Sequence, residues 1–165
     1  MKRIFALALA ATLLLCGCGG NNDGGVTPPP TPTNGIVIHD TTLFIGGNLS
    51  ADKQASLGEP ISTSEAPSCL YEGMDTVREY DGFTLQTYRV GETDVIVMVT
   101  IETAAFVTDK GIKVGDTAEA VSTAYGAAAE ETKNYVVYND TPTTTLTFSL
   151  KNGVVTAIEY AQAAA

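Results

Sequence analysis

Few residues of this chain have the types and spacing that enzyme chemistry requires. The chain has one histidine, His39, and one cysteine beyond its N-terminal segment, Cys69. A cysteine and a histidine can act as nucleophile and base, but no sequence signature links these two. We interpret His39 as a solvated or packing residue and Cys69 as a small core residue. Spacings typical of metal sites and phosphate-binding loops do not occur. The sequence therefore predicts no catalytic residue, no metal ligand and no cofactor.

The other two cysteines close an apolar N-terminal segment. Two basic residues precede the apolar run 4–15, which is too short to span a bilayer and is typical of a signal peptide. The run ends in Leu15-Cys16-Gly17-Cys18, which resembles the lipobox of bacterial lipoproteins, where a peptidase cuts before a cysteine that carries acyl chains. Cys18 fits better than Cys16, because the small residue Gly17 precedes it. The resemblance implies that residues 1–17 are removed and that Cys18 is lipidated, which anchors the protein to a membrane or cell surface outside the cytoplasm. The alternative is an ordinary secretory signal.

The composition indicates an acidic globular protein. Hydrophobic residues make up 44% of the chain and charged residues 17%, and the net charge is −10. Removal of residues 1–17 would leave 7 basic and 19 acidic residues, hence a net charge near −12. Such a body repels nucleic acid and anionic lipid headgroups. We therefore expect no nucleic-acid partner, and membrane contact through the acyl anchor alone.

Residues 18–35 have the composition of a tether. Beyond the cysteine they read GGNNDGGVTPPPTPTNG, in which glycine and asparagine favour flexibility and the prolines favour stiff polyproline II. We expect this segment to hold a folded domain away from the membrane.

Residues 110–165 predict one helix followed by a meander. Asp116 is a good N-cap residue and Glu119 completes a capping-box pattern. Apolar residues then follow at helical spacing, and Gly126 suits the position after the last turn. We expect a helix over Thr117–Tyr125.

The rest of this unit has the period of two that is typical of strands. The sequence predicts strands at Tyr135–Tyr138, Thr143–Leu150 and Val154–Tyr160, with a turn at 139–142. Asn152-Gly153 is the pair that a type I′ hairpin turn prefers. One helix and a three-stranded antiparallel meander are expected.

Residues 36–109 repeat this order more weakly. A polar stretch between Gly47 and Gly58 has the same length as the helical segment of the later unit. Strands are predicted at Val77–Tyr80, Phe83–Val90 and Asp94–Ile101, the last apolar enough to be covered on both faces. The predicted fold class is α+β, with antiparallel sheet, short helices on one face and two degenerate tandem helix–meander units. Chance similarity between the two units is the alternative.

The glycine-flanked helix carries a second resemblance. The run Gly111-Ile112-x-Val114-Gly115-Asp116-Thr117, with a short helix, Tyr125-Gly126 and tyrosine-rich strands after it, is similar to the SmpA/OmlA-type lipoproteins, which include BamE-type assembly factors. Tandem copies also resemble the β-lactamase-inhibitor protein family. The resemblance implies a non-enzymatic envelope protein that presents a sheet surface to a protein partner. It transfers no contact residues to this chain.

Three functions remain open at this point. The first is a membrane-anchored binding module, with Tyr80, Phe83 and Tyr88 around the Asp81-Gly82 turn as candidate partner-binding residues, because tyrosines on a sheet suit interfaces. The second is an inhibitor of a secreted or envelope enzyme, which would need a projecting loop near Asp81 or in Ser62–Ser68. The third is a cell-envelope assembly factor. An enzyme, such as a cell-wall hydrolase, is a further alternative.

Overall fold

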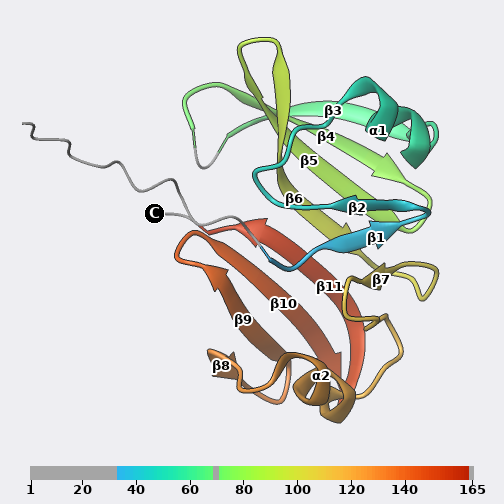
Figure 1. Ribbon diagram of the computed structural model, residues 1–165, viewed down its shortest axis with the longest axis vertical. Helices are drawn as coiled ribbons and strands as arrows, with labels where there is room; N and C mark the ends of the chain where they lie inside the picture. The colour runs from blue at the N-terminus through green and yellow to red at the C-terminus, as the bar shows by residue number, and fades with distance from the viewer. Residues whose placement is uncertain (1–32, 69–70, 164–165) are drawn as a thin grey trace, which may run out of the picture.

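The structure is a computed structural model that describes residues 33–68 and 71–163, and strands dominate its α+β fold (Figure 1). The two helices are α1 (Ala51–Leu57) and α2 (Ala118–Tyr125). The strands are β1 (Ile36–Ile38), β2 (Thr41–Leu43), β3 (Ser62–Pro67), β4 (Met74–Tyr80), β5 (Phe83–Val90), β6 (Thr93–Ile101), β7 (Val107–Thr108), β8 (Glu130–Glu131), β9 (Tyr135–Thr141), β10 (Thr144–Lys151) and β11 (Val154–Gln162).

One antiparallel sheet of eight strands forms the body of the protein. Its order is β3-β4-β5-β6-β11-β10-β9-β8. Strands β3–β6, which belong to residues 36–109 (the first half), therefore lie on one side of the sheet. Strands β8–β11, which belong to residues 110–165 (the second half), lie on the other side. β6 and β11 join the halves through four residue pairs, from Ile101↔Ile158 to Met98↔Ala161. The predicted division at residue 109 thus separates two segments that share one continuous sheet.

The two faces of this sheet differ in chemistry. One face carries the hydrophobic core, in which Tyr160, Phe148, Leu146, Leu85 and Ile101 are fully buried. We call the other face the open face. Side chains alternate between the faces of a sheet, and the strand register places two rows of residues across the open face: Ser64, Val77, Gln86, Met98, Ala161, Thr145 and Asn139, and Ser62, Glu79, Thr84, Thr100, Glu159, Thr147, Val137 and Glu130.

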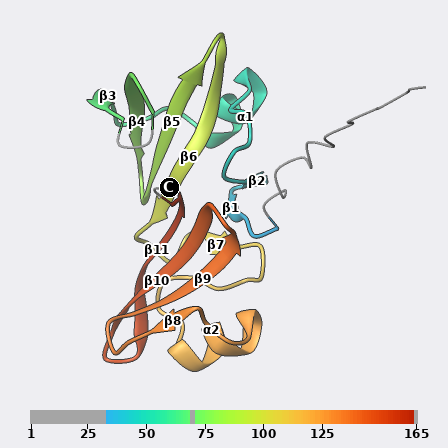
Figure 2. The ribbon, with the colours of Figure 1, turned by 90° about the vertical axis from the view of Figure 1, so that its left-hand side faces the viewer.

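The core face is covered by both helices and by a small second sheet. Leu57 of α1 and Val121 of α2 belong to the core cluster. The small sheet has the order β2-β1-β7, and its Ile36, Ile38 and Leu43 are fully buried. In the view at right angles, α1, β1 and β2 lie to one side of the strands of the first half (Figure 2). The prediction of short helices on one face is confirmed.

The helix ends follow capping rules, with one correction. Ser50 caps α1 and Thr117 caps α2, each accepting a hydrogen bond from the backbone N–H three residues on. The prediction that Asp116 is the N-cap is wrong, because its carboxylate accepts from the backbone N–H of Lys113 instead, 2.9 Å away. Asp116 therefore closes the preceding turn and leaves the capping position to its neighbour.

The predicted meanders are confirmed with shifted ends. The predicted limits of β5 are those observed, and both residues of the Asn152-Gly153 turn have positive φ, 54° and 76°. The turn predicted at 139–142 lies later, because β9 continues to Thr141. β6 is central but not equally covered, since Met98 and Thr100 on its open-face side are half-buried. The segment Ser62–Ser68, expected as a loop, contains edge strand β3.

The end of the predicted tether belongs to the fold. Asn34 and Gly35 are buried, and the Gly35 carbonyl accepts a hydrogen bond from the backbone N–H of Asp109, 2.9 Å away. A Cβ on Gly35 would lie 2.6 Å from Thr42 Cγ2. The absence of a side chain therefore lets this segment pack against β2, and the domain begins before the predicted residue 36.

Candidate functional site

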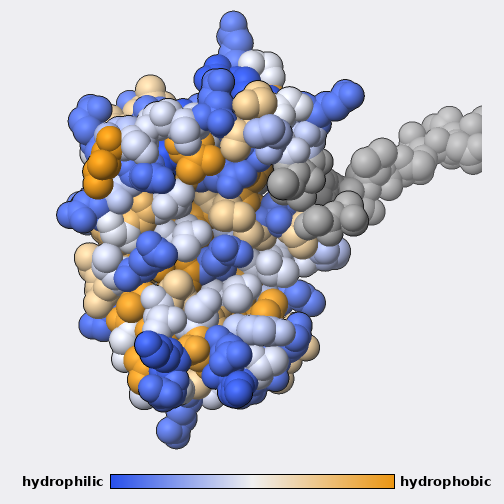
Figure 3. Space-filling model, turned by 180° about the vertical axis from the view of Figure 1, so that it is seen from behind, coloured by the Kyte–Doolittle hydropathy of each residue, from blue (hydrophilic) through white to orange (hydrophobic). Residues whose placement is uncertain are grey.

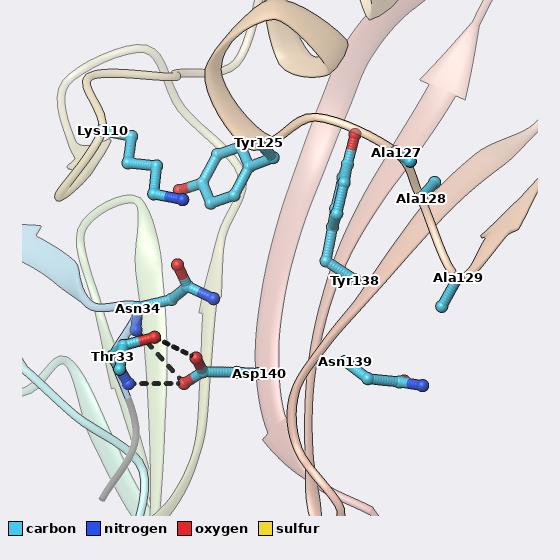
Figure 4. A pocket seen from close by; sticks show the side chains of 10 residues that line it. All are labelled: Thr33, Asn34, Lys110, Tyr125, Ala127, Ala128, Ala129, Tyr138, Asn139 and Asp140. Carbon is cyan, nitrogen blue, oxygen red and sulfur yellow. Dashed lines mark hydrogen bonds between the residues drawn. The ribbon is translucent and has the colours of Figure 1, made fainter.

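The candidate site is a cavity of about 360 Å³ beside α2, here called the Asn34 pocket (Figure 4). It is bounded by the start of the described chain, the turn before α2, the segment after α2 and strand β9. The residues that line it are Thr33, Asn34, Lys110, Tyr125, Ala127, Ala128, Ala129, Tyr138, Asn139 and Asp140.

Asp140 fixes one wall of the Asn34 pocket. Its Oδ2 accepts from the backbone N–H groups of Thr33 and Asn34, at 2.9 and 3.2 Å, and its Oδ1 accepts from Thr33 Oγ1 at 2.5 Å. The hydroxyl of the fully buried Tyr160 also donates to Oδ2. Burial alone would raise the pKa of Asp140, but the hydrogen bonds from Thr33, Tyr160 and Asn34 outweigh it and lower the pKa. Asp140 is therefore ionised and holds the segment before β1, at Thr33 and Asn34, against β9.

Two tyrosines and a lysine form the opposite wall. The rings of Tyr125 and Tyr138 have centroids 5.2 Å apart at 39°. Lys110 Nζ lies 4.3 Å from the centroid of the Tyr125 ring, a cation–π contact. The Tyr138 hydroxyl donates to the Gly126 carbonyl at 3.2 Å, which ties β9 to the end of α2. Burial raises the pKa of Tyr125 strongly, with the Asp109 carboxylate adding to the effect. Tyr125 is therefore a neutral hydrogen-bonding group at physiological pH.

Asn34 stands out because its carboxamide faces the pocket and forms no hydrogen bond with a described residue. The residue is 7% exposed, and its carboxamide makes no hydrogen bond with another residue in the described part of the chain. Figure 4 shows this carboxamide pointing into the space between Tyr125, Tyr138 and Asp140. The carboxamide atoms are not among the fully buried polar atoms that lack a partner, so they are accessible from the pocket. Asn34 therefore offers a donor and an acceptor to whatever occupies the pocket.

Two of the predicted partner-binding residues lie in the core. Tyr80 and Phe83 are 6% and 4% exposed, and their rings stack with centroids 4.3 Å apart. The edge of Phe106 meets Phe83 at 5.2 Å between centroids. The Tyr80 hydroxyl is buried without a hydrogen-bond partner among the described residues, and burial raises its pKa. These two aromatics stabilise the fold rather than forming an exposed cluster.

Tyr88 lies apart from that pair and is only half-buried. Its ring stacks on Tyr71, with centroids 4.3 Å apart at 26°, and its hydroxyl donates to the Glu72 carbonyl at 2.6 Å. Tyr71 in turn donates to Gln162 Oε1 at 2.8 Å. The segment before β4 thus folds back over the end of the sheet. The structure therefore does not bring Tyr80, Phe83 and Tyr88 together.

The nucleophile and base considered in the sequence do not form a described site. His39 is exposed, has a positive φ of 51° and meets Phe106 edge-on at 5.5 Å between centroids. Cys69 and Cys18 lie outside the described residues. Within residues 33–68 and 71–163, no three His, Cys, Asp or Glu side chains are grouped as metal ligands require. Neither of the two described helices has the length and hydropathy needed to cross a bilayer.

A buried ion pair supports the first half of the core face. Arg78 donates to Thr87 Oγ1 at 2.8 Å and to Asp94 Oδ2 at 2.9 Å. The other oxygen of Asp94 lies 2.5 Å from Nε of Arg89, whose side chain is 59% exposed. The buried guanidinium thus links strands β4, β5 and β6.

No protein-family model, no curated protein and no solved structure matches this chain. The functional argument therefore rests on the residues and geometry described above.

Sequence reasoning did not identify the residues of the Asn34 pocket. The sequence places Asn34 in the tether and Asp140 in a turn. These two positions lie 106 residues apart and meet only because the incoming chain crosses to β9. The one available signal was local: Asn34-Gly35 ends the proline-rich segment directly before the first apolar strand residues. That signal marks a boundary and says nothing of a pocket.

Proposed function

We propose that the protein is a non-enzymatic binding module, anchored to a membrane outside the cytoplasm through Cys18, whose open face binds a protein partner. The observation that carries this proposal is the open face itself. It extends over eight strands, while both helices and the small sheet pack on the other side. Among the described residues, Tyr71 and its neighbours cover one end of this face, where Asp75 and Ala161 are buried. The rest of the face is broad enough to suit a macromolecule rather than a small ligand.

The composition of the open face indicates the chemistry of that partner. Its two central rows contain three glutamates, Glu79, Glu159 and Glu130, and no lysine or arginine. Threonine and serine occupy much of the remainder, with half-buried Val77, Met98 and Val137 among them. From behind, the molecule shows pale and blue side chains with scattered orange ones (Figure 3). Charge complementarity therefore favours a partner with a basic surface.

The experiment is an affinity capture from the native envelope with the tagged full chain in detergent. Thr84→Arg and Thr147→Arg each place a cation in the middle of the open face and should repel a basic partner. Thr123→Arg is the matched control, because Thr123 is exposed on α2, on the covered side. Loss of one captured protein with both face variants and its retention with the control is expected. Retention by all three variants would overturn the proposal.

A second candidate is the inhibitor of an envelope or secreted enzyme. The hairpin between β5 and β6 extends from one end of the molecule (Figures 1 and 2). At its tip Val90 is 55% exposed and Glu92 is exposed beside it. A projecting apolar side chain next to an acid suits insertion into an active site. Loss of capture with Val90→Ser but not with Thr147→Arg would favour this candidate over the open face.

We also propose that the two halves are degenerate copies of one unit. Each half runs from a helix to a short edge strand and a three-stranded meander, α1-β3-β4-β5-β6 and α2-β8-β9-β10-β11. A glycine of positive φ follows each helix, Gly58 and Gly126. This order supports the resemblance to tandem inhibitor-type and assembly-factor lipoproteins. An assembly-factor role would be supported if the captured partner is an integral envelope protein.

A further inference from the structure

We propose that the Asn34 pocket binds a saccharide unit through the unpartnered carboxamide of Asn34. The pocket lies beside α2, on the side of the sheet away from the open face. This site is therefore independent of the protein-binding function proposed above.

The polar groups of the pocket match a ligand with several hydroxyls. The Asn34 carboxamide supplies two N–H donors and one carbonyl acceptor, none of them used by described residues. Asp140 Oδ1 accepts one bond, from Thr33, and has room for another. A hydroxyl donates and accepts at once, so neighbouring hydroxyls can satisfy both kinds of group. A ligand that only donates or only accepts would leave part of the Asn34 amide without a partner.

The charges of the pocket favour a ligand without net charge. Lys110 and Asp140 are the only charged residues that line it, and they carry opposite signs. The ammonium of Lys110 rests on the Tyr125 ring and forms no ion pair with a described residue, which leaves its N–H groups for neutral acceptors. A net anion would meet Asp140, and a net cation would meet Lys110. Neither sign of charge is selected by this lining.

A small apolar part of the mainly polar lining is available to the carbon skeleton of a sugar. The rings of Tyr125 and Tyr138 meet at 39°, and the faces of aromatic rings attract C–H groups. The Ala127–Ala129 segment offers methyl groups next to the rings. A volume of about 360 Å³ lies at the lower end of small-ligand sites. A pocket of this size and mainly polar lining suits one sugar unit, held by hydrogen bonds.

The test is a titration of the full chain in detergent with N-acetylglucosamine and with glucose, followed by NMR of the backbone amides. Saturable shifts at Ala127–Ala129 and Asn34 are expected, with a Kd in the millimolar range. Asn34→Ala should weaken binding about tenfold, the effect of losing one or two neutral hydrogen bonds. Asn48→Ala is the matched control, because Asn48 is exposed in the first half. Lys110→Gln, at an exposed position, provides a second variant that should weaken binding several-fold.

The possible outcomes separate clearly. Tighter binding of N-acetylglucosamine than of glucose would identify an amino-sugar polymer of the envelope as the source of the ligand. Equal binding would identify a general hexose site. Absence of saturable shifts with both sugars would overturn the proposal, as would shifts confined to other regions. Equal affinity of Asn34→Ala and Asn48→Ala would also overturn it, and so would tighter binding of phosphate or lysine than of either sugar.

Discussion

Replacement of Asp140 by alanine should destabilise the protein by about 2–4 kcal/mol. The carboxylate accepts four hydrogen bonds, of which two come from the exposed residue Thr33. These two donors return to water in the variant, so they contribute little. The hydroxyl of Tyr160 cannot bond to water in the variant, because the residue is fully buried. An orphaned buried hydroxyl costs about 1–3 kcal/mol, and the part-buried N–H of Asn34 adds about 1 kcal/mol.

Urea unfolding of Asp140→Ala, Tyr160→Phe and the double variant tests this account. Tyr160→Phe alone should cost about 1 kcal/mol, since Asp140 keeps three donors. In the double variant no hydroxyl remains to be orphaned, so its cost should be smaller than the sum of the two single costs. Additive costs would refute the reasoning, because they would show that Asp140 and Tyr160 act independently. A cost of Asp140→Ala below about 0.5 kcal/mol, the range of ordinary surface substitutions, would refute it as well.

The same residue gives a pH dependence of defined sign. The pKa of Asp140 is lower in the folded protein than in the unfolded chain. Its contribution to stability is therefore present above the ordinary aspartate pKa of about 3.9 and is lost as the pH falls through the lower, folded value. Asp140→Asn keeps the shape of the side chain but not its charge. The stability gap between wild type and this variant should be constant near neutral pH and should close below about pH 4.

Three further changes have predictable effects on urea unfolding. Arg78→Met should lower the free energy of unfolding by about 2–4 kcal/mol, because it leaves the carboxylate of Asp94 with one exposed partner, Arg89. Arg89→Met removes that exposed partner instead and should lower the free energy of unfolding by less than about 1 kcal/mol. Equal costs would contradict this assignment. Thr117→Ala should cost about 1 kcal/mol by removing the acceptor for the first turn of α2, and a compensating Thr117→Asp should restore it. Gly153→Ala should cost about 1–2 kcal/mol, because φ there is 76°; a neutral result would mean that the turn changes type.

Features set by neighbouring residues could be predicted from the sequence. The Asn152-Gly153 turn fixes the register of β10 against β11, since both of its residues adopt the positive φ that few other residues tolerate. The limits of β5 follow from the alternation of Phe83, Leu85 and Thr87 with half-buried residues. The capping of α2 was predicted one residue too early, because Asp116 and Thr117 are both good N-caps and only the packed structure selects between them.

Features that depend on distant pairing could not be predicted. β3 is exposed at nearly every position, so Ser62–Pro67 has no apolar alternation to mark it. β1 has an apolar sequence, but its partner β7 is a two-residue strand about seventy positions later. The Asn34 pocket could not be predicted for the same reason. Asn34 and Asp140 come together only because the segment before β1 crosses to β9 in the folded protein. The exposure of Tyr80 and Phe83 was equally undetermined, since a tyrosine suits a core edge as well as an interface.

The position of β11 has a consequence for the order in which the fold can be completed. β11, the last of the described strands, lies in the middle of the sheet, against residues 98–101 of β6. Until this strand is in place, β6 presents an unpaired and strongly apolar edge, which is the kind of edge that recruits other chains. A chain that is synthesised or exported N-terminus first must keep this edge unprotected until β11 follows, more than fifty residues later. Truncation before Ile158 should therefore produce aggregation rather than a shorter folded protein, because β11 is the strand that pairs with both β6 and β10.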